Sequence, residues 1–127
     1  MEKLKGGFVD YKDNVIVEKS FNFAKRMVGL RRSLIADENE YVLSNQILKS
    51  GTSIGANVSE AQRGQSKADF TAKMSIALKE AYETEYWLRL LYKTKYLDET
   101  QFESIHKDIL EIISLLMSIC KTASIKN

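Results

Sequence analysis

The sequence contains no proline and has one cysteine, one histidine and one tryptophan among its 127 residues. The absence of proline permits long uninterrupted helices and excludes a proline-rich linker. With Cys120 alone, no internal disulfide can form, which is typical of a protein from a reducing compartment. With His106 alone, every site that needs two imidazole groups is excluded, including the paired Glu-x-x-His motifs of a di-iron bundle.

Long apolar runs are also absent. No window reaches the roughly 18 continuous apolar residues of a membrane span, and the N-terminus lacks the apolar core of a signal peptide. We therefore expect a cytoplasmic protein with no membrane partner. The 19 basic and 17 acidic residues leave a net charge of only +2. Such a charge permits an anionic partner without requiring one, although self-association multiplies any basic patch.

Apolar residues instead recur at three- and four-residue steps, which is typical of amphipathic helices. The pattern predicts helices over about 15–35, 40–61 and 67–93, and a fourth from about 99 onward. The predicted fold class is all-α: an antiparallel up-down-up-down four-helix bundle in one domain, 1–127, with a short N-terminal arm over 1–13. Its predicted helix ends are an N-cap at Asn14, capping sequences at 66–69 and 98–101, and a left-handed C′ residue at Gly64.

The first predicted helix carries two adjoining apolar stripes, more than one bundle core usually needs. We therefore expect this helix to pack on two sides. One stripe consists of Ile16, Phe23, Met27, Leu30 and Leu34, and the other of Val17, Phe21, Ala24 and Val28.

The middle of the second helix, residues 50–56, has almost no side-chain bulk, and we refer to it as the small-residue segment. A glycine in a helix interior costs about 1 kcal/mol relative to alanine, so its presence indicates a close approach of another backbone or a ligand. We predict a seam for helix packing or for contact between identical copies. Its residues are Ser50, Gly51, Ile54, Gly55, Asn57 and Glu60.

Asn57 and Glu60 have two readings. They fix the register between helices or subunits, through hydrogen bonds to Lys73, Ser75 or Glu80, or they form a polar patch that lines a channel or contacts a partner.

No catalytic arrangement emerges from the remaining polar residues. Glu103 and His106 supply one half of a di-iron motif, and we interpret them as a solvated pair on the outer face of the last helix. Burial in an apolar helix is expected to raise the pKa of Cys120. No lysine follows the glycines with P-loop spacing. We therefore predict a protein that is not an enzyme and has no metal or cofactor.

Seven basic residues are predicted to gather where the first and third helices end, together with five acidic residues that begin the second and fourth. The basic residues either complement the helix dipoles or bind nucleic acid, and nearby Tyr86, Tyr92 and Tyr96 either stack on bases or complete the core. The candidate nucleic-acid-binding residues are Lys25, Arg26, Arg31, Arg32, Arg89, Lys93 and Lys95.

The run from Lys49 to Ala61, KSGTSIGANVSEA, resembles one bacterial family, together with Leu43, Gln46, the Ser66…Phe70 helix start and the Ser75–Ala81 run. These are the small four-helix-bundle proteins encoded in intervening sequences of large-subunit ribosomal RNA genes. The family resembles the accessory protein of diversity-generating retroelements, a five-fold barrel that binds a reverse transcriptase and nucleic acid. The resemblance covers residues from Val15 to about Ile119.

The resemblance implies a homopentamer that contacts RNA or DNA, with a reverse transcriptase or another protein as a further partner. Our leading hypothesis is therefore a non-enzymatic, homo-oligomeric scaffold that binds nucleic acid weakly. The alternative is a protein–protein interaction module with no nucleic-acid role.

Overall fold

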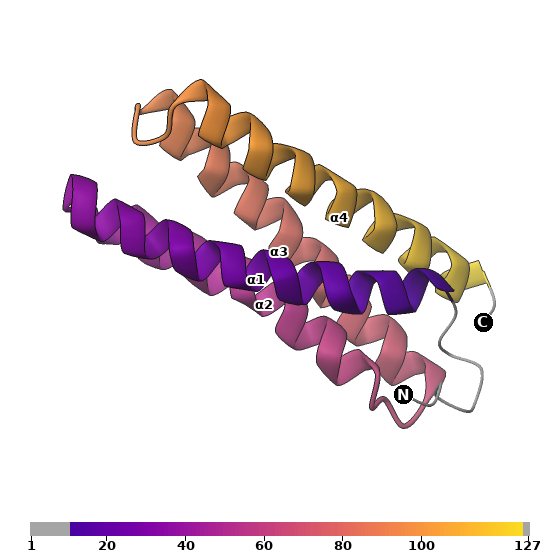
Figure 1. The fold of residues 1–127 in the computed structure, drawn as a ribbon. Helices are drawn as coiled ribbons and strands as arrows, with labels where there is room; N and C mark the ends of the chain where they lie inside the picture. The colour runs from indigo at the N-terminus through magenta and orange to yellow at the C-terminus, as the bar shows by residue number, and fades with distance from the viewer. Residues whose placement is uncertain (1–10, 126–127) are drawn as a thin grey trace.

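The computed structural model describes residues 11–125, with side chains from Asn14 to Ser124. Within this range the chain forms four helices: α1 (Tyr11–Glu38), α2 (Val42–Ala61), α3 (Lys67–Lys93) and α4 (Glu99–Ile125). Successive helices run in opposite directions (Figure 1). Each helix packs on the next, and α1 closes the bundle against α4 with the least extensive contact of the four pairs. The predicted up-down-up-down bundle is confirmed, and most of the predicted arm lies outside the described residues.

The helix starts follow from side-chain caps. Ser66 Oγ accepts a hydrogen bond from the Asp69 backbone N–H at 3.1 Å. Asp98 and Gln101 each accept from the other's backbone N–H, at 2.8 and 3.0 Å, as their spacing predicts. The prediction for Asn14 was wrong, because α1 already begins at Tyr11. Helix α2 begins after Glu40, whose buried carboxylate accepts three backbone hydrogen bonds, from residues 42–44. An anion is favourable at this position because the helix N-terminus is positive.

The predicted left-handed conformation of Gly64 is also wrong. Gly64 serves a close approach instead, since a Cβ atom there would lie 3.1 Å from the Phe70 backbone nitrogen. The left-handed positions belong to Asn39 and Lys95, with φ of 53° and 72°. Asn39 follows α1, and the N–H of the next residue, Glu40, donates to the Leu34 carbonyl oxygen. Lys95 follows α3, and the N–H of the next residue, Tyr96, donates to the Leu91 carbonyl oxygen. Asparagine adopts this conformation more readily than most residues, whereas for Lys95 the turn geometry imposes it.

One of the two stripes of α1 is in the core. Ile16, Met27 and Leu34 are at most 2% exposed. The other stripe is not covered within the chain, because Val17, Phe21 and Val28 are 36%, 64% and 38% exposed. Within a single copy, therefore, only one of the two apolar stripes of this helix is covered by other helices.

The small-residue segment lies between helices of one chain. A Cβ atom at Gly51 would collide with the Met27 side chain, approaching its sulfur to 2.9 Å, and one at Gly55 would lie 3.1 Å from the Ser20 carbonyl oxygen. On the other side of α2, the buried hydroxyls of Ser50 and Thr84 are 2.9 Å apart and hydrogen-bonded. The glycines therefore allow α1 to approach α2, and the hydroxyl pair links α2 to α3. Ile54, fully buried, belongs to the core between them.

We predict that the effect of Gly51→Ala on stability depends on the residue at position 27. With Met27 present, overpacking costs about 1–3 kcal/mol, which offsets or exceeds the gain of about 1 kcal/mol from helix propensity. In a Met27→Ala background the space is free, and the same substitution should raise the free energy of unfolding by about 1 kcal/mol. Urea denaturation of the four variants measures both effects. An equal effect in both backgrounds would contradict the assigned contact.

Candidate functional site

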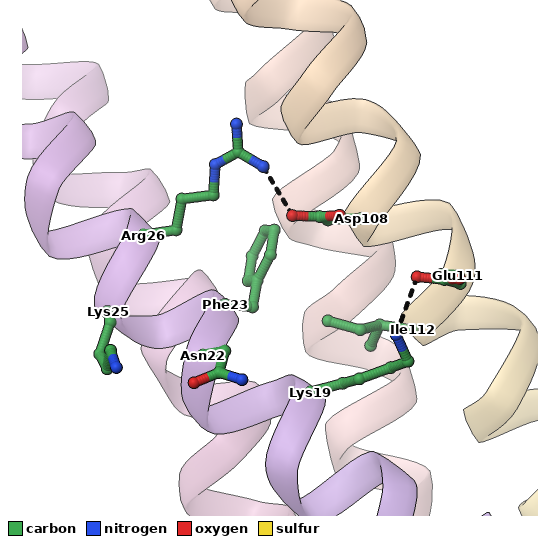
Figure 2. Close-up of a pocket in the computed structure, with 8 residues that line it drawn as sticks. All are labelled: Lys19, Asn22, Phe23, Lys25, Arg26, Asp108, Glu111 and Ile112. Carbon is green, nitrogen blue, oxygen red and sulfur yellow. Dashed lines mark hydrogen bonds and ion pairs between the residues drawn. The ribbon is translucent and has the colours of Figure 1, made fainter.

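A polar groove of about 600 Å³ runs between α1 and α4. Two ion pairs cross it: Lys19 to Glu111 at 3.1 Å, and Arg26 to Asp108 at 2.6 Å (Figure 2). Arg26 also donates to the Ser104 hydroxyl on α4 at 2.5 Å. The groove is further lined by Asn22, Phe23, Lys25 and Ile112.

Three of the predicted nucleic-acid-binding residues already have partners within the chain. Arg26 is held by α4, as described above. Arg89 Nε donates to both carboxylate oxygens of Glu85 at 3.0 Å. Arg31 Nε donates to Asn45 Oδ1 at 2.8 Å, a neutral partner that leaves its charge uncompensated. Neither Asp108 nor Glu85 was identified as a partner from the sequence. The pairing of Arg26 with Asp108 depends on how α1 sits beside α4, whereas the four-residue spacing of Glu85 and Arg89 on one helix was a signal available in the sequence.

The other four cations, Lys25, Arg32, Lys93 and Lys95, do not lie together. Lys25 lines the α1–α4 groove, with Nζ 5.9 Å from the centre of the Phe21 ring. Lys93 and Lys95 line a second hollow, of about 590 Å³, at the end of the bundle where α1 and α3 end. Arg32 is exposed, and its side chain, like that of Lys95, has no hydrogen-bond or ion-pair partner among the described residues. The seven cations therefore do not line one common pocket.

The hollow at this end of the bundle carries both signs of charge. Glu38 and Asp98 line it together with Lys93 and Lys95, as the positions of the helix ends predict. Its Tyr92 is stacked on Phe102, with ring centres 4.3 Å apart. Of the other tyrosines proposed for base stacking, Tyr96 packs on the core and Tyr86 is half exposed.

His106 lies between α3 and α4, and not on a solvated outer face with Glu103 as the sequence suggested. Its Nε2 is 2.8 Å from Glu85 Oε2, and its ring stacks on Phe102 with centres 4.7 Å apart. Burial raises the pKa of Glu85, but hydrogen bonds from His106 and Arg89 outweigh it, so the pKa is lowered from the ordinary value of 4.5. This cluster holds α3 and α4 together near their shared turn.

Asn57 and Glu60 hold polar contacts within the bundle. Asn57 Nδ2 donates to the Ser53 carbonyl oxygen, one turn earlier in α2, at 2.9 Å. Glu60 is exposed and forms an ion pair with Lys73 of α3 at 2.8 Å, one of the contacts expected from the sequence. The hydrogen bond and charge of Lys73 lower the pKa of Glu60, and Glu60 raises that of Lys73.

The part of the chain that the structure describes contains no cluster of three or more metal-ligating His, Cys, Asp or Glu residues. Cys120 is half buried, which raises its pKa as expected and disfavours the thiolate. None of the helices in the described range is both long and apolar enough to cross a membrane.

Seven of the ten large apolar side chains exposed in the described range lie on two surfaces on different sides of the bundle, and Tyr41, Val42 and Ile76 are exposed outside them. The first, the outer face of α1, consists of Val17, Phe21 and Val28. The second was not identified from the sequence as a unit. It lies on α3 and α4, contains side chains that are 48–50% exposed, and is named here the α3–α4 patch: Tyr82, Tyr86, Leu110 and Met117. The seven-residue spacing of Leu110 and Met117, off the buried stripe of α4, was the signal available in the sequence.

We predict a pH-dependent contribution of Glu85 to stability. Because its pKa is lower in the folded than in the unfolded chain, the contribution is complete above the ordinary pKa of 4.5 and is lost as the pH falls through the lower folded value. Glu85→Gln should therefore lower the free energy of unfolding by about 1 kcal/mol at pH 7 and much less at pH 3. Chemical denaturation at both pH values measures this. The control Glu103→Gln removes an exposed carboxylate and should show no such difference; equal losses for Glu85→Gln at both pH values would refute the prediction.

Comparisons with known proteins identify the family. A crystal structure of a protein of unknown function from the S23 ribosomal protein family of Bacteroides thetaiotaomicron is similar over 87% of this chain and 98% of that chain, with 56% sequence identity and a TM-score of 0.85. No curated protein matches the chain. The family model described as 23S rRNA-intervening sequence protein matches residues 12–118. The resemblance noted in the sequence is thus confirmed, and the chain belongs to the 23S rRNA-intervening sequence protein family.

Proposed function

We propose that the protein is a non-enzymatic scaffold of the bacterial cytoplasm that assembles into a homopentamer and binds RNA or DNA weakly. One observation carries the assembly: large apolar side chains are exposed on two sides of a single copy, over the outer face of α1 and the α3–α4 patch. Exposed apolar surfaces of this kind mark sites of protein association. The subunit number of five follows the family resemblance.

The nucleic-acid part of the proposal rests on the cations that the bundle leaves uncompensated. Arg32 and Lys95 have no partner in the described part of the chain, Arg31 has only a neutral one, and Lys93 lies over the ring of Tyr92. Arg26 and Arg89 contribute less, because carboxylates within the chain already hold them. Contacts of this type bind phosphates without reading sequence.

A protein-interaction module with no nucleic-acid role is the second candidate. The acidic side chains of Glu38 and Asp98 favour it, because they share a hollow with Lys93 and Lys95 and weaken its attraction for phosphates. In this case the assembled protein holds a protein partner, such as a reverse transcriptase.

We predict that the protein elutes as an assembly of five 14.5 kDa chains in size exclusion coupled to light scattering. Phe21→Glu should reduce this mass, because it places a charge in an apolar contact, while circular dichroism remains helical. Gln46→Glu, on an exposed site of α2, is the matched control and should leave the mass unchanged. A monomeric wild-type protein at micromolar concentration would reject the assembly.

We predict that nucleic-acid affinity falls steeply with salt, because bound phosphates release counterions. Arg32→Glu and Lys95→Glu should each weaken binding to single-stranded RNA of any sequence and lower the salt slope by about 1. Arg63→Glu makes the same charge change in the turn at the opposite end of the bundle and should have little effect. Fluorescence anisotropy at several salt concentrations provides the measurement. If no RNA or DNA binds at low salt, the protein-interaction candidate replaces this one.

A further inference from the structure

We propose that the copies join head to tail, with the outer face of α1 of one copy packed, parallel, on the α3–α4 patch of the next. This inference rests on the proposed self-association and specifies which surfaces meet and in which direction. The occupant of the α1 face is thus a second copy of this chain.

The outer face of α1 has the shape of a contact for other helices. Val17, Phe21, Ala24 and Val28 follow one another at steps of four, three and four residues, the spacing of a helix–helix seam. Gly29 follows Val28 about 100° further around the helix, at the edge of this face. Apart from its chain neighbours and the local helix backbone, no heavy atom lies within 4 Å of the position its Cβ would take. Unlike Gly51 and Gly55, which face α1 of the same chain, Gly29 therefore makes no packing contact within one copy. A glycine in that position allows a helix from another copy to approach α1 closely.

The α3–α4 patch presents two helices side by side to such a partner. Tyr82 and Met117 are in contact across them, with the hydroxyl oxygen 3.4 Å from the sulfur. Tyr86 and Leu110 lie further along the same two helices and are 50% and 48% exposed. Because this patch differs from the outer face of α1, contact between the two is heterologous. Such a contact closes a ring when the rotation between neighbouring copies divides a full turn.

The order of charges along the two surfaces is complementary. On α1, Glu18 comes first and the exposed Lys25 follows one heptad later, with no acidic residue from 19 to 36. On α3 the order is reversed: Lys79 comes first and Glu83 follows, between the two tyrosines of the patch. Opposite charges therefore face each other when the two helices run in the same direction.

The remaining charges around the patch leave this order intact. Lys121, beyond Met117 on α4, adds a cation to the end of the patch that would receive Glu18. At the other end, Arg89 is compensated by Glu85, and the exposed Glu103 and Lys107 carry one charge of each sign.

The up-down-up-down topology supplies the required direction. Helices α1 and α3 run the same way within each copy, on opposite corners of the bundle (Figure 1). In a ring whose rotation axis lies along the bundle, every copy points the same way. The α1 of one copy is then parallel to the α3 of its neighbour, so that Glu18 faces Lys79 and Lys25 faces Glu83.

Disulfide trapping tests the pairing of the two surfaces and its register. Two variants in a Cys120→Ser background, Phe21→Cys and Met117→Cys, are co-expressed with different tags and oxidised. We expect a mixed disulfide dimer from the pair and none from either variant alone. Val28→Cys is the matched control, because it lies seven residues, about 10.5 Å, along α1 from Phe21, beyond disulfide reach of the same partner cysteine. Its yield with Met117→Cys should be at least about tenfold lower, since distant cysteines cannot be bridged without backbone movement.

The outcomes separate this inference from the proposed function. A disulfide dimer of Phe21→Cys alone, in a protein that light scattering shows to be oligomeric, means that α1 packs on α1 and overturns the head-to-tail pairing. Cross-linking of Val28→Cys in place of Phe21→Cys overturns this register of α1 on the patch. An oligomer with no cross-link from any pair overturns the choice of surfaces. If light scattering shows that both the Cys120→Ser protein and the wild type are monomers, the proposed self-association itself is overturned.

Discussion

The close approach of α1 to α2 is the constraint on which the other features of this bundle depend. Gly55 brings α2 within contact of the Ser20 carbonyl, and Gly51 leaves room for the buried Met27 side chain. Because neither contact tolerates added volume without a shift, they fix both the separation of the helices and the rotation of α1 about its axis. With Met27 turned inward, Phe21 must face outward.

That rotation also decides how the charges of α1 are used. It aims Lys19 and Arg26 across the groove at Glu111 and Asp108 of α4, and leaves Lys25 and Arg32 on the surface. The exposed pairs across the groove are worth little individually, which agrees with the limited contact between α1 and α4. A nearly neutral chain therefore keeps cations uncompensated at one end, and a ring with its axis along the bundle would gather these cations from every copy on one face.

On the other side of the molecule, a hydrogen-bonded cluster joins α3 to α4. Arg89 and His106 both bind Glu85, and Phe102 stacks between His106 and Tyr92. From the sequence alone, these polar and aromatic residues could equally have bound a ligand. In the structure they contact one another, and His106 is used to join α4 to Glu85 of α3. The surface left exposed on these helices includes the α3–α4 patch, where Tyr82 contacts Met117 and Tyr86 packs edge-on against Trp87.

The sequence by itself determined the helices, their order and the family, because periodic apolar residues, capping pairs such as Asp98 with Gln101 and the small-residue segment are local signals. It also predicted that α1 has two packing surfaces. Only the tertiary structure decided that Gly51 and Gly55 face α1 of the same chain, that Asn39 and Lys95 take the left-handed positions in place of Gly64, and that Asp108 compensates Arg26. The reason is physical: helical periodicity defines which residues share a face, whereas the neighbour that each face meets depends on the rotation and separation of packed helices, which residues distant in the sequence set together.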